Sequence, residues 1–122
     1  MSNDVEGKPP EDLQDRTERF ALAIIKFTSG VVKNEESRVL TRQLLRSGTS
    51  IGANYAEAKR ARSRAEFVSK TGDSLKEAEE TKYWLRLLHR AGLANPSKCA
   101  PLLSEIEELL AILTAINKRS KD

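Results

Sequence analysis

Residues 46–58 read Arg-Ser-Gly-Thr-Ser-Ile-Gly-Ala-Asn-Tyr-Ala-Glu-Ala, a run of small and hydroxyl side chains inside a long amphipathic pattern. A glycine inside a helix costs about 1 kcal/mol relative to alanine, so Gly48 and Gly52 need a compensating role in packing. Small residues let another backbone approach closely. We therefore expect this segment to form the tightly packed centre of a helical bundle, with polar groups inside it.

Four segments of the chain carry apolar residues at alternating spacings of three and four, which is the pattern of amphipathic helices. We expect helices over about 11–32, 35–61, 64–91 and 97–118. Gly92 stands at a helix stop, where we expect left-handed backbone. Short joints between such helices predict an all-α, antiparallel up-down four-helix bundle over residues 11–119. Residues 1–10 contain Gly7, Pro9 and Pro10 and little apolar content, so we expect a disordered N-terminal tail there.

Length and composition set the broad class of the protein. The chain has 122 residues, 32% of them charged and 5% aromatic, which suits one all-helical domain. No apolar run reaches the roughly 18 residues that span a membrane, and the polar, acidic beginning does not match a secretory signal. Cys99 is the single cysteine, so no intrachain disulfide can form. We expect a cytoplasmic protein with no cofactor and no membrane partner.

The search for catalytic residues gives none. His89 is the single histidine, and neither it nor Cys99 has a nucleophile or base partner in the sequence. No phosphate-binding loop, dinucleotide fingerprint or His-Glu-x-x-His helix is present. Glu77 and Glu80 have the spacing of a dimetal bundle site, but no histidine follows at the required offset, so pairing with arginines or with Asn54 and Ser50 is favoured. We expect a protein that is not an enzyme and has no metal site.

Positive charge is concentrated in the middle of the chain. Residues 38–64 hold seven basic residues against one acidic residue, whereas residues 1–18 hold six acidic against two basic. At about 100° per residue, five arginines project within about 80° of each other on the second predicted helix. This arginine stripe consists of Arg38, Arg42, Arg46, Arg60 and Arg64. Three interpretations stay open: a solvated face, salt bridges to another subunit, and phosphate binding.

The residue types of the arginine stripe favour phosphate binding. Arginine suits bidentate phosphate contacts, and the sequence has no interleaved aromatic ladder for base stacking. Binding of RNA or DNA by the stripe, together with Lys59, should therefore be backbone-directed, weakly sequence-specific and strongly salt-dependent.

The same helix has two further predicted features. The arginine stripe is small in its middle, which indicates that another subunit packs there, and the predicted interface residues are Thr49, Gly52, Ala53 and Ala56. On the opposite face, polar residues fall among the core positions Leu44 and Ile51. A buried amide without partners costs about 1–3 kcal/mol, so these polar residues must be hydrogen-bonded. The predicted buried polar network is Ser47, Ser50, Asn54, Glu57, Glu77 and Glu80.

Residues 47–58 resemble the central segment of the four-helix-bundle family of 23S rRNA intervening-sequence proteins. Further similarity lies at 66–67, 75–81 and 83–85, and the resemblance spans about residues 20–116. It implies a bundle that assembles into a ring, a homopentamer in related proteins. Relatives include the accessory variability proteins of diversity-generating retroelements, which bind nucleic acid and assist a reverse transcriptase. The expected function is an oligomeric nucleic-acid-binding accessory protein. The alternative is a protein–protein interaction scaffold whose arginines form salt bridges with partners or neighbouring subunits.

Overall fold

The computed structural model describes residues 11–122 and contains four α-helices. They are α1 (Leu13–Ser29), α2 (Glu35–Lys59), α3 (Arg64–Arg90) and α4 (Pro96–Lys121). The described part of the chain has no strand, so the prediction of an all-α helical bundle is confirmed. The tail predicted for residues 1–10 lies outside the described residues.

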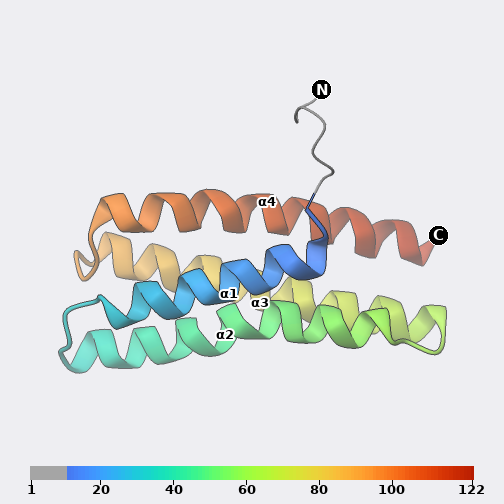
Figure 1. The fold of residues 1–122 in the computed structure, drawn as a ribbon, viewed down its shortest axis with the longest axis horizontal. Coiled ribbons are helices and arrows are strands. Elements are labelled where there is room, and N and C mark those ends of the chain that lie inside the picture. The colour runs from blue at the N-terminus through green and yellow to red at the C-terminus, as the bar shows by residue number, and fades with distance from the viewer. Residues whose placement is uncertain (1–10) are drawn as a thin grey trace.

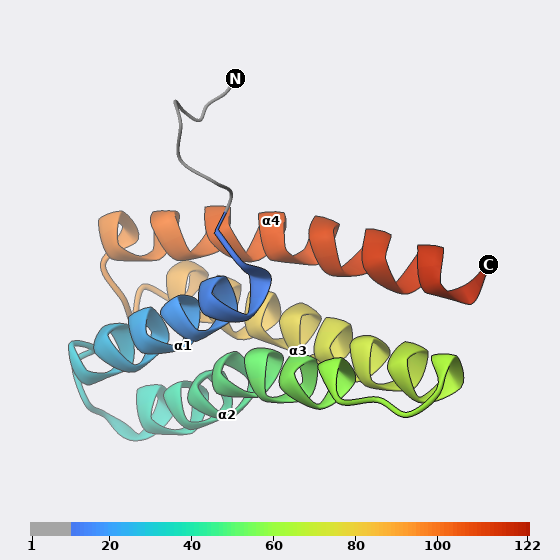
Figure 2. The ribbon, with the colours of Figure 1, turned by 45° about the vertical axis from the view of Figure 1, so that its right-hand side comes forward.

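The helices lie side by side along the long axis of the molecule (Figure 1). Around the bundle α1 is followed by α2, α3 and α4, and α4 returns to contact α1. The α1–α2 and α3–α4 loops lie at one end, and the α2–α3 loop lies at the other end beside the C-terminus of α4 (Figures 1 and 2). Because α1 has 17 residues and the others have 25 to 27, α1 covers only part of the length of its neighbours.

Each helix begins where a side chain caps its free backbone N–H groups. The N-cap residues are Asp12, Asn34, Ser63 and Asn95. Asn34 and Ser37 cap each other reciprocally, with backbone-to-side-chain distances of 2.8 and 3.0 Å. Gly92 has a φ of 72°, so the predicted left-handed backbone is confirmed, and Leu93 N–H donates to Leu88 O at 3.0 Å.

Helix boundaries differ from the prediction at several ends. Helix α1 is shorter than 11–32, because Asp12 caps its start and Gly30 takes the C-cap position. Helix α2 ends at Lys59 instead of residue 61, because Arg60 leaves helical hydrogen bonding and Ser63 caps the next helix. Helix α4 continues to Lys121, beyond the predicted end at 118.

Aliphatic side chains from all four helices fill one core. The largest of those with almost no exposed surface are Ile24, Leu44, Ile51, Leu85, Leu88, Ile106, Leu109 and Leu113. Burying one such side chain contributes about 1.5–3 kcal/mol relative to leaving it exposed. Arg16 ties the beginning of α1 to α4 from outside this core, with its Nε 2.7 Å from Glu105 Oε2 and its Nη2 2.6 Å from Glu108 Oε1.

The two central glycines of α2 bring α1 close to the bundle. A Cβ on Gly48 would lie 3.1 Å from two carbons of Ile24. A Cβ on Gly52 would lie 2.8 Å from Thr17 Oγ1 and 3.2 Å from Thr17 Cβ. Gln14 also donates from Nε2 to Gly52 O at 3.1 Å. The close packing predicted for residues 46–58 is therefore observed, and its partner is α1 of the same chain.

Candidate nucleic-acid interface

Arg38 and Arg42 lie exposed on α2, at the end of the bundle that holds the α1–α2 loop. With Lys33 they line a groove of about 320 Å³ between the end of α1 and α2. None of the nine lining residues is acidic, and within residues 11–122 no carboxylate forms a salt bridge with any of these three cations. We call this site the basic groove. The groove leaves three cationic donors available to an anion.

Arg46 differs from Arg38 and Arg42 because it is already paired. Its Nη1 lies 3.1 Å from Glu77 Oε1, and its Nη2 lies 2.5 Å from Glu80 Oε1. Both carboxylates belong to α3 of the same chain. The guanidinium of Arg46 therefore joins α2 to α3, and its place in a phosphate-binding stripe does not fit this geometry.

Arg64 does not belong to the α2 stripe, because α2 ends at Lys59 and Arg64 is the first residue of α3. Its Nη2 donates to the backbone oxygen of Asp122. This contact places the C-terminus of α4 beside the start of α3, as both ribbon views show (Figures 1 and 2).

A second group of cations consequently gathers at this end of the bundle. Lys59 and Arg60 come from the end of α2, and Lys59 Nζ lies 6.0 Å from the centre of the Tyr55 ring. The last turns of α4 add three exposed residues that the sequence analysis did not include: Lys118, Arg119 and Lys121. The up-down order of the helices was the signal that could have found them, because it returns the end of α4 to the α2–α3 loop.

The predicted subunit interface divides into two parts. Ala53 is exposed, and Thr49 and Ala56 are half-buried, so these three remain available on the outer face of α2. Gly52 is buried against Thr17 of α1, and its assignment to the interface was wrong. The physical reason is that α1 of the same chain packs on this side of α2, about 100° around the helix from Ile51.

Large apolar side chains are also exposed on α1 and α2. Leu45 on α2 keeps 38% of its surface exposed, and Leu22 and Ile25 on α1 keep 60% and 47%. Exposed apolar side chains mark an interaction surface where they form one contiguous patch.

The buried polar network differs from the prediction in most of its members. Ser47 is buried and its hydroxyl lies 2.9 Å from that of Thr81. Asn54 is only half-buried and donates to Ser50 O on its own helix at 3.1 Å. Glu57 is exposed and pairs with Lys70 of α3 at 2.7 Å, which lowers the pKa of this carboxyl.

The predicted buried network was also wrong for Ser50, Glu77 and Glu80. Ser50 donates to Arg46 O, and the two glutamates pair with the Arg46 guanidinium, so none of the three joins a buried network. Charged side chains occupy the margin of the α2–α3 seam, because burial of a carboxylate is far more costly than burial of a hydroxyl.

Polar residues outside the predicted network form hydrogen bonds inside the bundle. Ser74 donates to Ile51 O at 2.8 Å, across the α2–α3 contact. Asn117 Nδ2 lies 2.9 Å from both Val68 O and Thr71 Oγ1, across the α3–α4 contact. The described residues contain no group of three or more His, Cys, Asp or Glu that could hold a metal ion. No helix within residues 11–122 is long and apolar enough to cross a membrane.

The chain is similar to one known protein family in both sequence and structure. The model of a family described as 23S rRNA-intervening sequence protein matches residues 12–115. The chain belongs to this family. A crystal structure of a protein with unknown function, from the S23 ribosomal protein family of Bacteroides thetaiotaomicron VPI-5482, has a TM-score of 0.81 and 38% identity to this chain. The similarity covers 88% of this chain and 99% of that chain. No match was found among curated proteins.

The family match confirms the resemblance expected from residues 47–58. The matched residues, 12–115, contain the cations of the basic groove, Lys33, Arg38 and Arg42, and also Arg46 with its two glutamate partners. The cations at the end of α4, Lys118, Arg119 and Lys121, lie beyond the residues that match the family.

Proposed function

We propose that this protein is a non-enzymatic, oligomeric accessory protein that binds RNA or DNA through phosphate contacts. The observation that carries the proposal is the basic groove, in which Lys33, Arg38 and Arg42 have no acidic residue among the lining side chains. Arginine forks match two phosphate oxygens at once, and ion pairs of this kind are stronger than neutral hydrogen bonds.

The mode of binding follows from the side chains of the groove. The hydroxyls of Ser29 and Thr41 donate to backbone carbonyls of their own helices, so the cations supply the donors for a phosphate. No aromatic residue lines the groove, which disfavours base stacking. The contacts should therefore follow the sugar–phosphate backbone, with weak sequence preference and a steep dependence on salt.

Assembly is the second half of the proposal. The small residues Thr49, Ala53 and Ala56, with Leu45 beside them, offer a face on which a second copy can pack closely. The antiparallel up-down bundles would then form a ring-like homo-oligomer, a homopentamer if it follows the relatives that the sequence resembles. Each copy adds one basic groove, and repetition of weak sites raises the overall affinity without a new contact.

The cellular setting is part of the same proposal. The sequence resemblance to accessory proteins of diversity-generating retroelements makes a reverse transcriptase one candidate partner, beside another protein of the cytoplasm. The protein-interaction scaffold is the alternative, and the exposed Leu22, Ile25 and Leu45 favour it over a simple solvated surface.

Fluorescence anisotropy with a labelled single-stranded RNA and its duplex tests the binding half. The variant is Arg38→Gln with Arg42→Gln, and the control is Lys76→Gln with Arg86→Gln, which removes the same charge from exposed residues of α3. From about 50 to about 200 mM salt, the groove variant should bind single-stranded RNA roughly tenfold more weakly and reduce the salt slope by about 1.4. Equal losses in both variants would contradict binding at the groove, and no binding by the native protein at low salt would favour the scaffold.

A further inference from the structure

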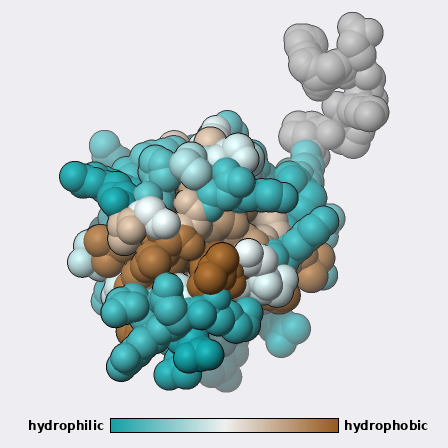
Figure 3. Space-filling view, turned by 90° about the vertical axis from the view of Figure 1, so that its left-hand side faces the viewer, coloured by the Kyte–Doolittle hydropathy of each residue, from teal (hydrophilic) through white to brown (hydrophobic). Residues whose placement is uncertain are grey.

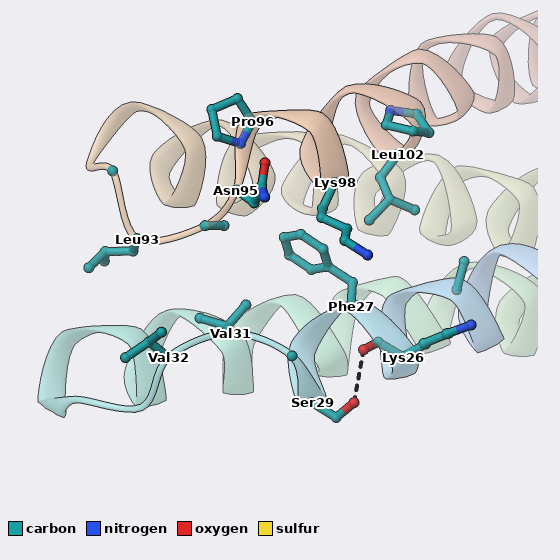
Figure 4. A pocket seen from close by; sticks show the side chains of 15 residues that line it. Lys26, Phe27, Ser29, Val31, Val32, Leu93, Asn95, Pro96, Lys98 and Leu102 are labelled. Carbon is teal, nitrogen blue, oxygen red and sulfur yellow. Dashed lines mark hydrogen bonds between the residues drawn. The ribbon is translucent and has the colours of Figure 1, made fainter.

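An apolar cleft lies beside the basic groove, at the end of the bundle that holds the α1–α2 and α3–α4 loops (Figure 4). Its volume is about 880 Å³, within the range of about 300–1,000 Å³ typical of small-molecule sites. Phe27 and Val31 from the α1 side face Leu93 and Leu102 from the α4 side across it. Figure 3, which views this end of the molecule, shows apolar residues gathered at its centre and hydrophilic residues around them.

α1 and α4 diverge toward this end of the bundle, and the cleft lies between them (Figures 1 and 2). Arg16 holds the two helices together near the start of α1, through Glu105 and Glu108. No comparable ion pair among residues 11–122 joins them near the end of α1. Small residues in the two loops, Gly30 and Gly92 among them, leave the space between the helices unfilled.

Two lysines give the apolar cleft a charge. Lys26 comes from α1 and Lys98 from α4, so they stand on opposite walls; Lys98 extends from α4 toward α1, and Lys26 extends along α1 (Figure 4). None of the 15 lining residues is acidic. Within the described chain neither ammonium group pairs with a carboxylate. An anion with an apolar body would complement both the walls and the charge.

We propose that this cleft binds a small organic carboxylate with an unbranched hydrocarbon chain, the chemical class of a medium-chain fatty acid. The chain packs along Phe27, Val31 and Leu102, and the carboxylate accepts from Lys26 and Lys98. Phosphate esters of RNA lack the hydrocarbon body that this lining favours. The cleft borders the basic groove, since Ser29 and Val31 line both, but its cations are different: Lys26 and Lys98 here, and Lys33, Arg38 and Arg42 in the basic groove.

Amide-resolved NMR titration of the full chain with decanoate tests the proposal. Shifts should concentrate at backbone amides of the cleft, including Gly30, Gly92 and Ala94. Decanol, which has the same chain without the charge, should bind at least tenfold more weakly. The double substitution Lys26→Gln with Lys98→Gln should weaken decanoate binding about tenfold, while Lys76→Gln on α3 should leave it unchanged. Circular dichroism checks that each variant keeps its helices.

Three outcomes would overturn the proposal. One is decanoate binding by the double variant with native affinity, and another is equal binding of decanol and decanoate. The third is an absence of decanoate shifts at the cleft; if these amides instead changed on dilution of the protein, a second copy would be the occupant. Loss of RNA binding in the groove variants would not affect these results, so the two proposals fail independently.

Discussion

Replacing Gly52 by alanine should destabilise the bundle, although alanine is the better helix former. The new Cβ would lie 2.8 Å from Thr17 Oγ1 and 3.2 Å from Thr17 Cβ. Rotation of the Thr17 side chain can move the oxygen, but its Cβ is fixed to the backbone of α1. Relief therefore requires a shift of α1 itself, whose Thr17 is completely buried.

The magnitude follows from two opposing effects. Removing a helical glycine stabilises by about 1 kcal/mol. Overpacking a well-packed contact costs about 1–3 kcal/mol, and the contact with a fixed atom places Gly52 in the upper part of that range. The free energy of unfolding should fall by about 1–2 kcal/mol, which lowers Tm by roughly 4–8 °C in a domain of this size.

Gly72→Ala on α3 is the matched control. Its Cβ would have Asn117 Nδ2 at 3.7 Å as nearest neighbour, an ordinary contact, so the substitution should stabilise by about 1 kcal/mol. Urea unfolding of both variants at one protein concentration measures the difference, expected at about 2–3 kcal/mol. A Gly52→Ala protein as stable as the native chain would refute the close approach of α1 to α2.

Three further predictions concern single groups. Thr81→Val removes the hydroxyl that donates to Ser47 Oγ at 2.9 Å, while Ser47 keeps Leu44 O as its own acceptor at 3.3 Å; the free energy of unfolding should drop by about 1 kcal/mol in urea titration, whereas an unchanged midpoint would deny the contact. The pKa of Glu57 is lowered by the hydrogen bond from Lys70, so this pair stabilises the fold above pH 4.5 and the effect is lost as pH falls through the lowered pKa. Carbon-detected NMR titration of Lys70→Gln should show that pKa rising toward 4.5, and no rise would contradict the pairing. Burial raises the pKa of the Cys99 thiol, so a disulfide reagent should label it slowly at pH 8 in the native protein and rapidly in urea; fast native labelling would show that the start of α4 opens.

Most of the fold could be predicted because it depends on periodicity and caps. The alternation of three and four placed Leu44 and Ile51 in the core, and Gly92 marked a helix end by its backbone freedom. Helix boundaries were harder to predict. Helix α1 ends earlier than expected, and the loop at 60–63 separates Arg64 on α3 from the other arginines of the predicted stripe. Periodicity alone gives no signal for such a break when the residues on both sides favour helix.

The site was harder to predict because it depends on which helices meet. Helical phase placed Arg38, Arg42 and Arg46 on one stripe. The sequence favoured arginines among the partners of Glu77 and Glu80, but only the contact with α3 shows that Arg46 is the arginine that they pair with. Position on a helical wheel also could not decide whether Gly52 faces another chain or α1. Lys33, in a loop, has no helical phase at all, and only the fold brings it to the basic groove.

The central claim is that the outer face of α2 joins copies of this chain and so multiplies their basic grooves. Sedimentation equilibrium over a wide range of protein concentration tests it directly, with Ala53→Lys as the variant and Ala111→Lys on exposed α4 surface as the control. The native protein and the control should sediment as one defined multiple of 13.6 kDa, and Ala53→Lys as single chains of that mass. A native protein of 13.6 kDa at every concentration, or an Ala53→Lys protein that assembles like the native one, would contradict the claim.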